Sequence, residues 1–311
     1  MYSLYNGVFV VLVYLLRSPM GIKIKLLQIA LLAVGMFNVC LAPVMAQSSQ
    51  SPVELVRKTV NNELQSSDDH GRFMFLDRKQ TPRGSQSKLL VETKDGVAGL
   101  VVAKNDQPLS AGDQKAELAR VQRFITNPDE LKRKQKQEKE DTEHVSRIMK
   151  ALPDAFLYEF AGTEEGTNER GKQGHELVRL KFKPNPRYDP PSRVEQVLTG
   201  MSGTMLIDSL EDRIAEIDGK LSEQVSFGWG ILGHLNQGGR FLVQQADVGD
   251  DCWEVTRMDL DFTGKILLFK SLSIKSTETS SDFQKVPGNL TFAQGVDLLK
   301  KEQARLAGKQ L

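Results

Sequence analysis

The sequence predicts an α+β protein built on a single, strongly curved antiparallel sheet of about nine to eleven strands, with a long charged helical insertion. Nearly every segment after Phe156 has strand character, and turns rather than helices separate these segments. Parallel strands would need crossover helices, so the neighbours are expected to be antiparallel. Helical signals lie before Phe156, at 52–66 and within 110–152. A sheet of this size curls rather than staying flat, and we expect one domain over 47–290.

The composition excludes several broad classes of protein. The chain has 311 residues, with 41 Lys and Arg against 40 Asp and Glu, which gives a net charge of +1. This balance gives no bulk attraction to nucleic acid. The 2 Cys and 4 His are too scattered for a zinc module or a disulfide scaffold. A collagen, a coiled-coil rod, a polytopic membrane protein and a basic nucleic-acid binder are therefore excluded.

Residues 1–46 resemble an export signal. From Met20, the basic residues Lys23 and Lys25 precede an almost uncharged apolar run over 26–41. The segment Val44-Met45-Ala46 then suits a cleavage site, so we expect cleavage before Gln47 and a periplasmic protein.

A second apolar stretch, 8–16, lies upstream of Met20 and is too short to span a bilayer. The simplest account is that Met20 is the true start; the alternative is an uncleaved signal anchor in the inner membrane that faces the periplasm. Cys40 lacks the small preceding residues that lipid modification prefers. After cleavage only Cys252 remains, and it is expected to be a small buried hydrophobe.

The first helix is predicted over 52–66. It opens with the capping box Ser51-Pro52-Val53-Glu54. Apolar residues then recur at helical spacing. They are Val53, Val56, Val60 and Leu64.

The insertion over 110–152 is expected to contain a helix at about 112–126, and residues 127–130 have the signature of the start of a second helix. No apolar residue occurs over 132–144. A helix that is polar all round does not pack into a core, so this charged arm is expected to project into solvent or to fray. Apolar residues at helical spacing then return the helix to the body before Pro153; they are Val145, Ile148, Met149 and Leu152.

Strand character recurs along the rest of the chain. The expected strands are 72–78, 88–94, 97–104, 156–161, 176–183, 203–208, 213–221, 224–229, 240–246, 253–262, 265–275 and 282–286. Val255 shares a face with Met258, Leu260 and Phe262 only if a bulge intervenes near Thr256. Residues 291–311 form a C-terminal tail, and whether it is helical stays open.

Residues 228–233 match the pattern G-x-G-x-x-G of dinucleotide sites. Such a site needs a helix after the last glycine, so that its N-terminal amides receive the pyrophosphate. Only three residues separate Gly233 from the Gly238-Gly239 turn, which leaves no room for a helix. We therefore interpret the segment as an apolar loop and expect no cofactor.

Neither a metal site nor a catalytic motif is visible. The four histidines lack partners at ligand spacing; they are His70, His144, His175 and His234. There is no G-x-S-x-G elbow. Carboxylates in the strands alternate with apolar residues, as on the solvent face of a one-sided sheet; they include Asp208, Asp212, Asp218, Asp259 and Asp261. The protein is therefore expected not to be an enzyme.

Apolar and aromatic side chains from successive strands are the remaining candidates for a site. A curved sheet has a concave side that could admit an apolar guest, and such sites are lined mainly by hydrophobic groups. The candidate ligand-binding residues are Phe227, Trp229, Ile231, Leu232, Phe241, Trp253, Phe262 and Phe269. Ordinary core packing is the alternative explanation for the same residues.

Three segments carry a family resemblance: GTMLID over 203–208, RIAEIDGKL over 213–221 and DCWEVTR over 251–257. Together they resemble the LolA/LppX-like superfamily, which includes periplasmic lipoprotein carriers, lipid-binding lipoproteins and the sigma-factor regulator RseB. With its charged arm, the chain is also similar to exported proteins of acidobacteria. The resemblance covers 203–287 well and 52–104 weakly. It implies a half-barrel with helices over its concave face, acyl chains as guests and no catalysis. The insertion at 110–152 departs from simple carriers.

Two functions follow as expectations. The first is a non-catalytic envelope protein, a carrier or sensor, that binds acyl chains of lipid or lipoprotein. The alternative is an envelope scaffold or regulator that has no small ligand and binds a protein partner through the charged arm. In both cases we expect a monomer, no nucleic acid, and peripheral or no membrane contact.

Overall fold

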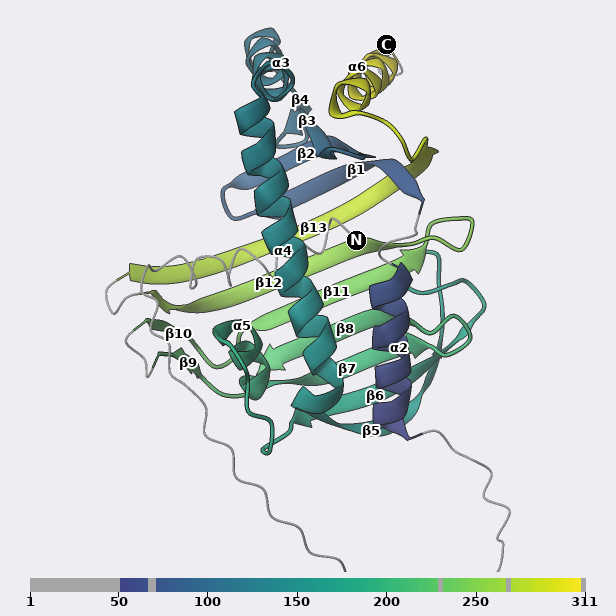
Figure 1. Ribbon diagram of the computed structural model, residues 1–311, viewed down its shortest axis with the longest axis vertical. Coiled ribbons are helices and arrows are strands. Elements are labelled where there is room, and N and C mark those ends of the chain that lie inside the picture. Colours follow the sequence, from purple (N-terminus) through teal and green to yellow (C-terminus); the bar gives the residue numbers. More distant parts are fainter. Residues whose placement is uncertain (1–50, 67–70, 229–231, 267–269, 309–311) are drawn as a thin grey trace, which may run out of the picture.

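A computed structural model of the chain describes residues 51–66, 71–228, 232–266 and 270–308 (Figure 1). The expected signal peptide at 1–46 lies outside the described residues. Within them, the helices are α2 (Pro52–Ser66), α3 (Ala111–Thr126), α4 (Pro128–Ala155), α5 (Arg193–Gln196) and α6 (Phe292–Gly308), with one 3₁₀ turn, η1 (Val197–Gly200). No helix in this part of the chain is long and apolar enough to cross a membrane.

All strands of the described residues belong to one antiparallel sheet of 13 strands. They are β1 (Arg72–Thr81), β2 (Gly84–Thr93), β3 (Gly96–Lys104), β4 (Gln107–Pro108), β5 (Phe156–Glu165), β6 (Glu176–Pro184), β7 (Met201–Asp208), β8 (Arg213–Leu221), β9 (Val225–Phe227), β10 (Gly233–Leu235), β11 (Arg240–Asp247), β12 (Trp253–Ile266) and β13 (Lys270–Val286). Their order is β4-β3-β2-β1-β13-β12-β11-β8-β7-β6-β5, and β9 and β10 extend from β12. Because β4 and β5 form opposite edges, the sheet is not closed into a barrel.

The predicted class, α+β with a large antiparallel sheet, is confirmed, whereas the expected strand count of nine to eleven is too low. Strands β4 and β10 are two and three residues long, too short for any periodicity to show, whereas β9 lies within the expected strand at 224–229. The expected strand at 265–275 is also wrong, because Ile266 at the end of β12 pairs with Lys270 at the start of β13. Strand β13 then continues through the segment 282–286 that was expected to be separate.

The bulge expected near Thr256 is confirmed. Gln244 of β11 pairs with Arg257 of β12, whereas Gln245 pairs with Val255, so Thr256 is the extra residue. The extra residue reverses the alternation and places the apolar residues on either side of it in one core. These residues are Val255, Met258, Leu260 and Phe262.

Two apolar clusters hold the helices to the sheet. In the larger one, α2 and α4 lie side by side over the half of the sheet that ends at β5 (Figure 1). In the smaller one, α3 and α6 pack on β2 and β3. Helix α6 contributes Phe292, Val296 and Leu299 to this second core. The segment expected to be a tail is therefore packed as part of the body.

The charged arm does not project into solvent, contrary to expectation. Helix α4 continues through it without a break and crosses one face of the sheet (Figure 1). Gln135 Nε2 donates a hydrogen bond to the carbonyl of Asp95, 3.0 Å away. Glu138 accepts one from the backbone N–H of Val97. Gly96 permits this approach, because a Cβ there would lie 2.5 Å from a Glu138 oxygen. The polar helix face thus packs on the polar β2–β3 turn, a partner that hydropathy alone does not reveal.

A buried carboxyl in the sheet makes stability depend on pH. Asp77 on β1 is 8% exposed, and burial, followed by the charge of Glu278, raises its pKa to about 6. In the unfolded chain this group titrates near pH ~4. Between these two pH values the folded chain holds a proton that the unfolded chain has lost, so stability is present at low pH and falls as pH rises through this window.

We therefore expect Asp77→Asn to stabilise the protein at neutral pH by on the order of 2–3 kcal/mol and to have little effect at about pH 4. Urea unfolding at a series of pH values measures this difference. An Asp77→Asn effect that is the same at both ends of the series would contradict it.

Candidate functional site

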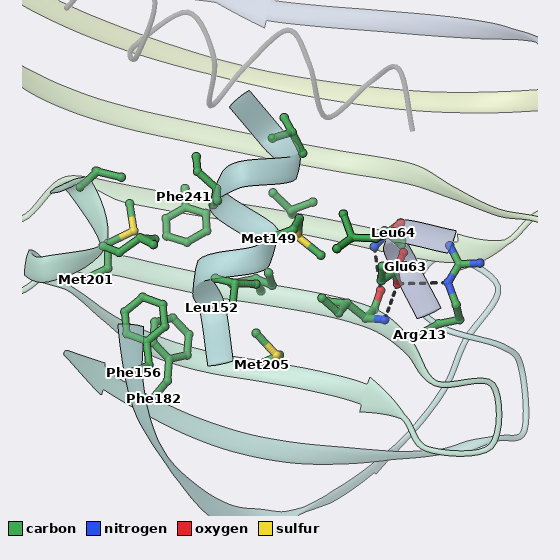
Figure 2. A pocket seen from close by; sticks show the side chains of 18 of the residues that line it. Glu63, Leu64, Met149, Leu152, Phe156, Phe182, Met201, Met205, Arg213 and Phe241 are labelled. Atoms are coloured by element: carbon green, nitrogen blue, oxygen red, sulfur yellow. Dashed lines mark hydrogen bonds and ion pairs between the residues drawn. The ribbon is translucent and has the colours of Figure 1, made fainter. Parts of the chain in front are cut away.

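A cavity of about 110 Å³ lies between the paired helices α2 and α4 and the sheet (Figure 2). Its walls come from both helices, from the 3₁₀ turn η1 and from strands β5 to β8, β11 and β12. The residues that line it are Glu63, Leu64, Ser66, Val145, Ile148, Met149, Leu152, Phe156, Phe182, Val197, Leu198, Met201, Met205, Arg213, Ile214, Ile217, Phe241, Val243, Gln245, Trp253 and Phe262. Most of these side chains are aliphatic or aromatic, so the cavity suits an apolar guest.

Helix α4 supplies one apolar wall of the cavity. Val145, Ile148, Met149 and Leu152 lie three or four residues apart, so they share the helix face that points at the sheet. Tyr158 Oη donates a hydrogen bond to the carbonyl of Leu152, 2.8 Å away, which fixes the end of the helix against β5.

The opposite wall is formed by the sheet and is rich in aromatic and sulfur-containing side chains. The rings of Phe156 and Phe182 lie with their centroids 4.7 Å apart on the neighbouring strands β5 and β6. Met205 on β7 and Ile217 on β8 are cross-strand partners on the same face. Methionine adapts to guests of different shape, because its side chain is unbranched and flexible.

One end of the cavity is polar (Figure 2). Glu63 of α2 accepts hydrogen bonds at Oε1 from Arg213 Nε, at 3.1 Å, and from the backbone N–H of Ile214, at 2.8 Å. Gln245 Nε2 donates to the carbonyl of Ile214, 3.0 Å away. The Arg213 guanidinium lies over the Trp253 ring, 5.4 Å from its centroid. This buried ion pair joins α2 to β8 at one end of an otherwise apolar space.

Only some of the predicted ligand-binding residues that the structure describes line the cavity. Phe241, Trp253 and Phe262 line the cavity. Phe227 and Leu232 belong to the same apolar cluster but do not line it, and Phe227 is fully buried. The other predicted residues, Trp229, Ile231 and Phe269, lie outside the described residues.

Sequence reasoning missed most of the cavity. The spacing of the α4 residues predicts an apolar helix face, but nothing in the sequence indicates which strands this face meets. Phe156 and Phe182 fall in predicted strands, where no pattern marks them as part of a site. Glu63 and Arg213 are about 150 residues apart in the chain; a buried acidic residue on the apolar face of 52–66 was the one available signal.

The glycine-rich segment does not open a nucleotide site. Gly233, its last glycine, begins strand β10 rather than a helix. Its φ is +133°, and a Cβ there would lie 2.2 Å from the carbonyl oxygen of Lys265. This glycine therefore permits close pairing of β10 with β12.

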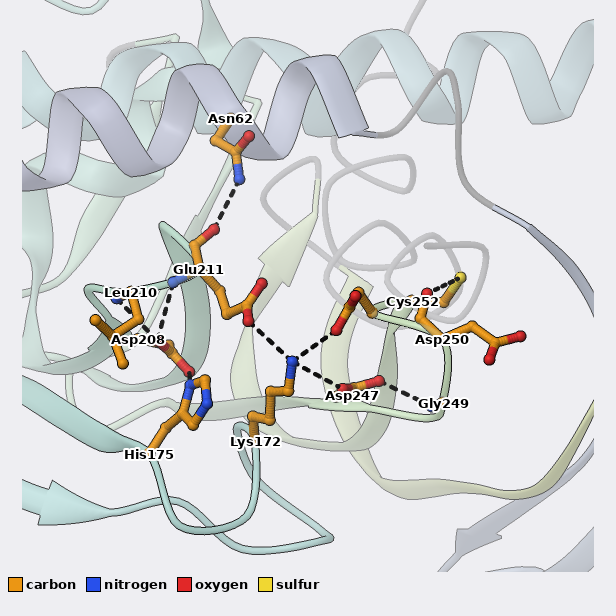
Figure 3. A network of polar contacts seen from close by, with 11 residues as sticks. Asn62, Lys172, His175, Asp208, Leu210, Glu211, Asp247, Gly249, Asp250 and Cys252 are labelled. Atoms are coloured by element: carbon orange, nitrogen blue, oxygen red, sulfur yellow. Dashed lines mark hydrogen bonds and ion pairs between the residues drawn. The ribbon is translucent and has the colours of Figure 1, made fainter.

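A second polar cluster joins loops at one end of the sheet (Figure 3). Lys172 Nζ lies 2.9 Å from a Glu211 oxygen and 2.6 Å from an Asp251 oxygen, and these hydrogen bonds raise the pKa of Lys172. His175 Nδ1 lies 2.8 Å from Oδ2 of the fully buried Asp208. The other oxygen of Asp208 accepts two backbone N–H groups of its own turn. The cluster does not line the cavity, and its contacts are those of a structural connection between loops.

Among the residues that the structure describes, no group of three or more His, Cys, Asp or Glu side chains is placed to hold a metal ion. The fold and the cavity together define an α+β protein with an open antiparallel sheet and an apolar cavity beneath two paired helices. Neither the protein-family models nor the curated proteins that were compared with the chain match it.

Proposed function

We propose that this protein is a non-catalytic carrier or sensor that binds an acyl chain of lipid or lipoprotein in the cavity under α2 and α4. The observation that supports this most directly is the lining, in which aliphatic, aromatic and methionine side chains predominate. Such a surface offers burial to a hydrocarbon chain at about 25 cal/mol per Å². The polar groups gather at one end, as an amphiphile with a single head requires.

The shape of the sheet and the cell compartment belong to the same proposal. We propose that the sheet is a half-barrel, that α2 and α4 cover its concave face, and that the protein acts in the periplasm or cell envelope after export. The placement of both helices over one half of an open sheet supports this arrangement. The resemblance to the LolA/LppX-like superfamily supports it independently.

The size of the cavity limits what it holds. Pockets for drug-sized ligands occupy roughly 300–1,000 Å³, whereas this cavity has about 110 Å³. It admits part of one acyl chain, and a complete chain requires α4 to move away from the sheet. The face of α4 over the cavity makes mainly apolar contacts, which are not directional and can be re-formed around a guest.

Filling the cavity should weaken the binding of an apolar guest. Ile217 lines it from β8, and Ile217→Trp is expected to weaken binding of dodecanol to the full chain by roughly tenfold or more, because the indole occupies the space of the guest. The matched control is Asp218→Trp, which changes the next residue on the same strand, on the opposite face. Isothermal titration calorimetry measures both affinities, and circular dichroism shows that both variants are folded.

The protein extracted from its own cells provides a second measurement. Native mass spectrometry should detect a bound lipid on the wild-type chain and less of it on Ile217→Trp. A chain that carries no lipid and takes up no hydrocarbon amphiphile would contradict the proposal. The alternative, a scaffold that binds a protein partner through α4, would then be favoured.

A further inference from the structure

We infer that the polar end of the cavity selects a single-chain amphiphile with an uncharged head group that both donates and accepts a hydrogen bond, such as an alcohol or an amide. This inference rests on the proposed function and names its ligand class. The groups that carry it are Glu63, Arg213 and Trp253, which all line the cavity.

Glu63 offers a hydrogen-bond acceptor. Its side chain is only 5% exposed, and both of its hydrogen bonds use Oε1. Oε2 makes no hydrogen bond with any residue that the structure describes. A carboxylate oxygen without a donor from the protein is a strong acceptor, and a donor from a ligand would satisfy it.

Trp253 offers a donor at the same end. Its side chain is 3% exposed, and within the described part of the chain its buried Nε1–H has no acceptor. Buried indole N–H groups normally have a partner, so this one is available to a ligand oxygen. Glu63 and Trp253 are both in contact with Arg213, so the residues that offer the acceptor and the donor meet at one guanidinium.

The charge balance at this end argues against an ionised head group. Glu63 and Arg213 neutralise each other, so a third buried charge would enter without a counter-ion and would lose its hydration. A carboxylate would also be repelled by the Glu63 oxygen that is open to it. A hydroxyl or an amide group avoids both costs, because it donates to Glu63 and accepts from Trp253.

The test compares two ligands with the same chain, dodecanol and dodecanoate, by titration calorimetry on the full chain at about pH 8, where carboxylic acids are ionised. We expect dodecanol to bind roughly tenfold or more tightly than dodecanoate. Glu63→Gln removes the negative charge and keeps the size, which leaves Arg213 without its counter-ion. In this variant the ratio of the affinity for dodecanol to that for dodecanoate should fall, or dodecanoate should become the tighter ligand.

The control is Asp154→Asn, which makes the same change of charge in the exposed ion pair with Arg57. Neither residue of this pair lines the cavity, so the variant should keep the wild-type preference for dodecanol. Equal affinity for the two ligands in the wild type, or tighter binding of dodecanoate, would overturn the inference and leave acyl-chain binding intact. Binding of neither ligand would overturn the proposed function itself. If Glu63→Gln does not fold, the wild-type comparison alone decides between these outcomes.

Discussion

Glu63→Leu is expected to destabilise the protein by about 3–5 kcal/mol, because it leaves the Arg213 guanidinium buried without its counter-ion. The backbone N–H of Ile214 also loses its acceptor, which lies 2.8 Å away in the wild type. Urea unfolding followed by circular dichroism measures the loss. The effect is large because removing one member of a buried pair exposes the full cost of desolvating the other.

The double variant Glu63→Leu with Arg213→Met separates the cost of an uncompensated buried charge from the cost of altered packing. Apolar side chains of similar volume often replace a buried ion pair at little cost. We expect the double variant to recover most of the stability lost in Glu63→Leu, to within about 1–2 kcal/mol of the wild type. A double variant no more stable than Glu63→Leu alone would show that the uncompensated charge is not the cause of the loss.

Phe182→Ala is expected to destabilise the protein by about 3–5 kcal/mol, because it removes a buried ring from the cavity wall. Phe182 is 4% exposed and packs against Phe156 and Tyr158. The enlarged cavity should take up dodecanol, so dodecanol should raise the thermal midpoint of this variant more than that of the wild type. Differential scanning calorimetry with and without dodecanol measures both effects.

Phe160→Ala is the matched control. Phe160 lies on the edge strand β5 and is 54% exposed, so its truncation should change stability by no more than about 0.5 kcal/mol. It should also leave the response to dodecanol unchanged. A Phe182→Ala variant as stable as Phe160→Ala would contradict the assignment of Phe182 to the core.

Local signals in the sequence predicted the elements better than the site. The capping box at 51–54 and the spacing that follows it predict α2 with its observed bounds. The register of apolar residues around Thr256 predicts the bulge, because alternation along a strand is an exact local rule. The same residues cannot show that Trp253 lies beside Arg213, since that contact depends on which strands become neighbours.

The polar half of α4 shows the limit of hydropathy. Residues 132–144 contain no apolar side chain, yet the side chains of Gln135 and Glu138 pack against the β2–β3 turn and form hydrogen bonds with its backbone. Hydropathy measures the preference for water over an apolar core, and it carries no information on polar partners that another segment provides. The prediction of a projecting arm was wrong for this reason.

The sequence by itself determined the class of the fold, the helices α2, α3 and α4, most strands and the apolar character of the strands that form the sheet. These properties follow from short-range periodicity, which each segment carries alone. Only the tertiary structure decided where the cavity lies and which charges close its end. Glu63, Arg213 and Trp253 come from three separate elements, α2, β8 and β12. They meet because the sheet order and the crossing of α2 bring them together, and both depend on long-range packing.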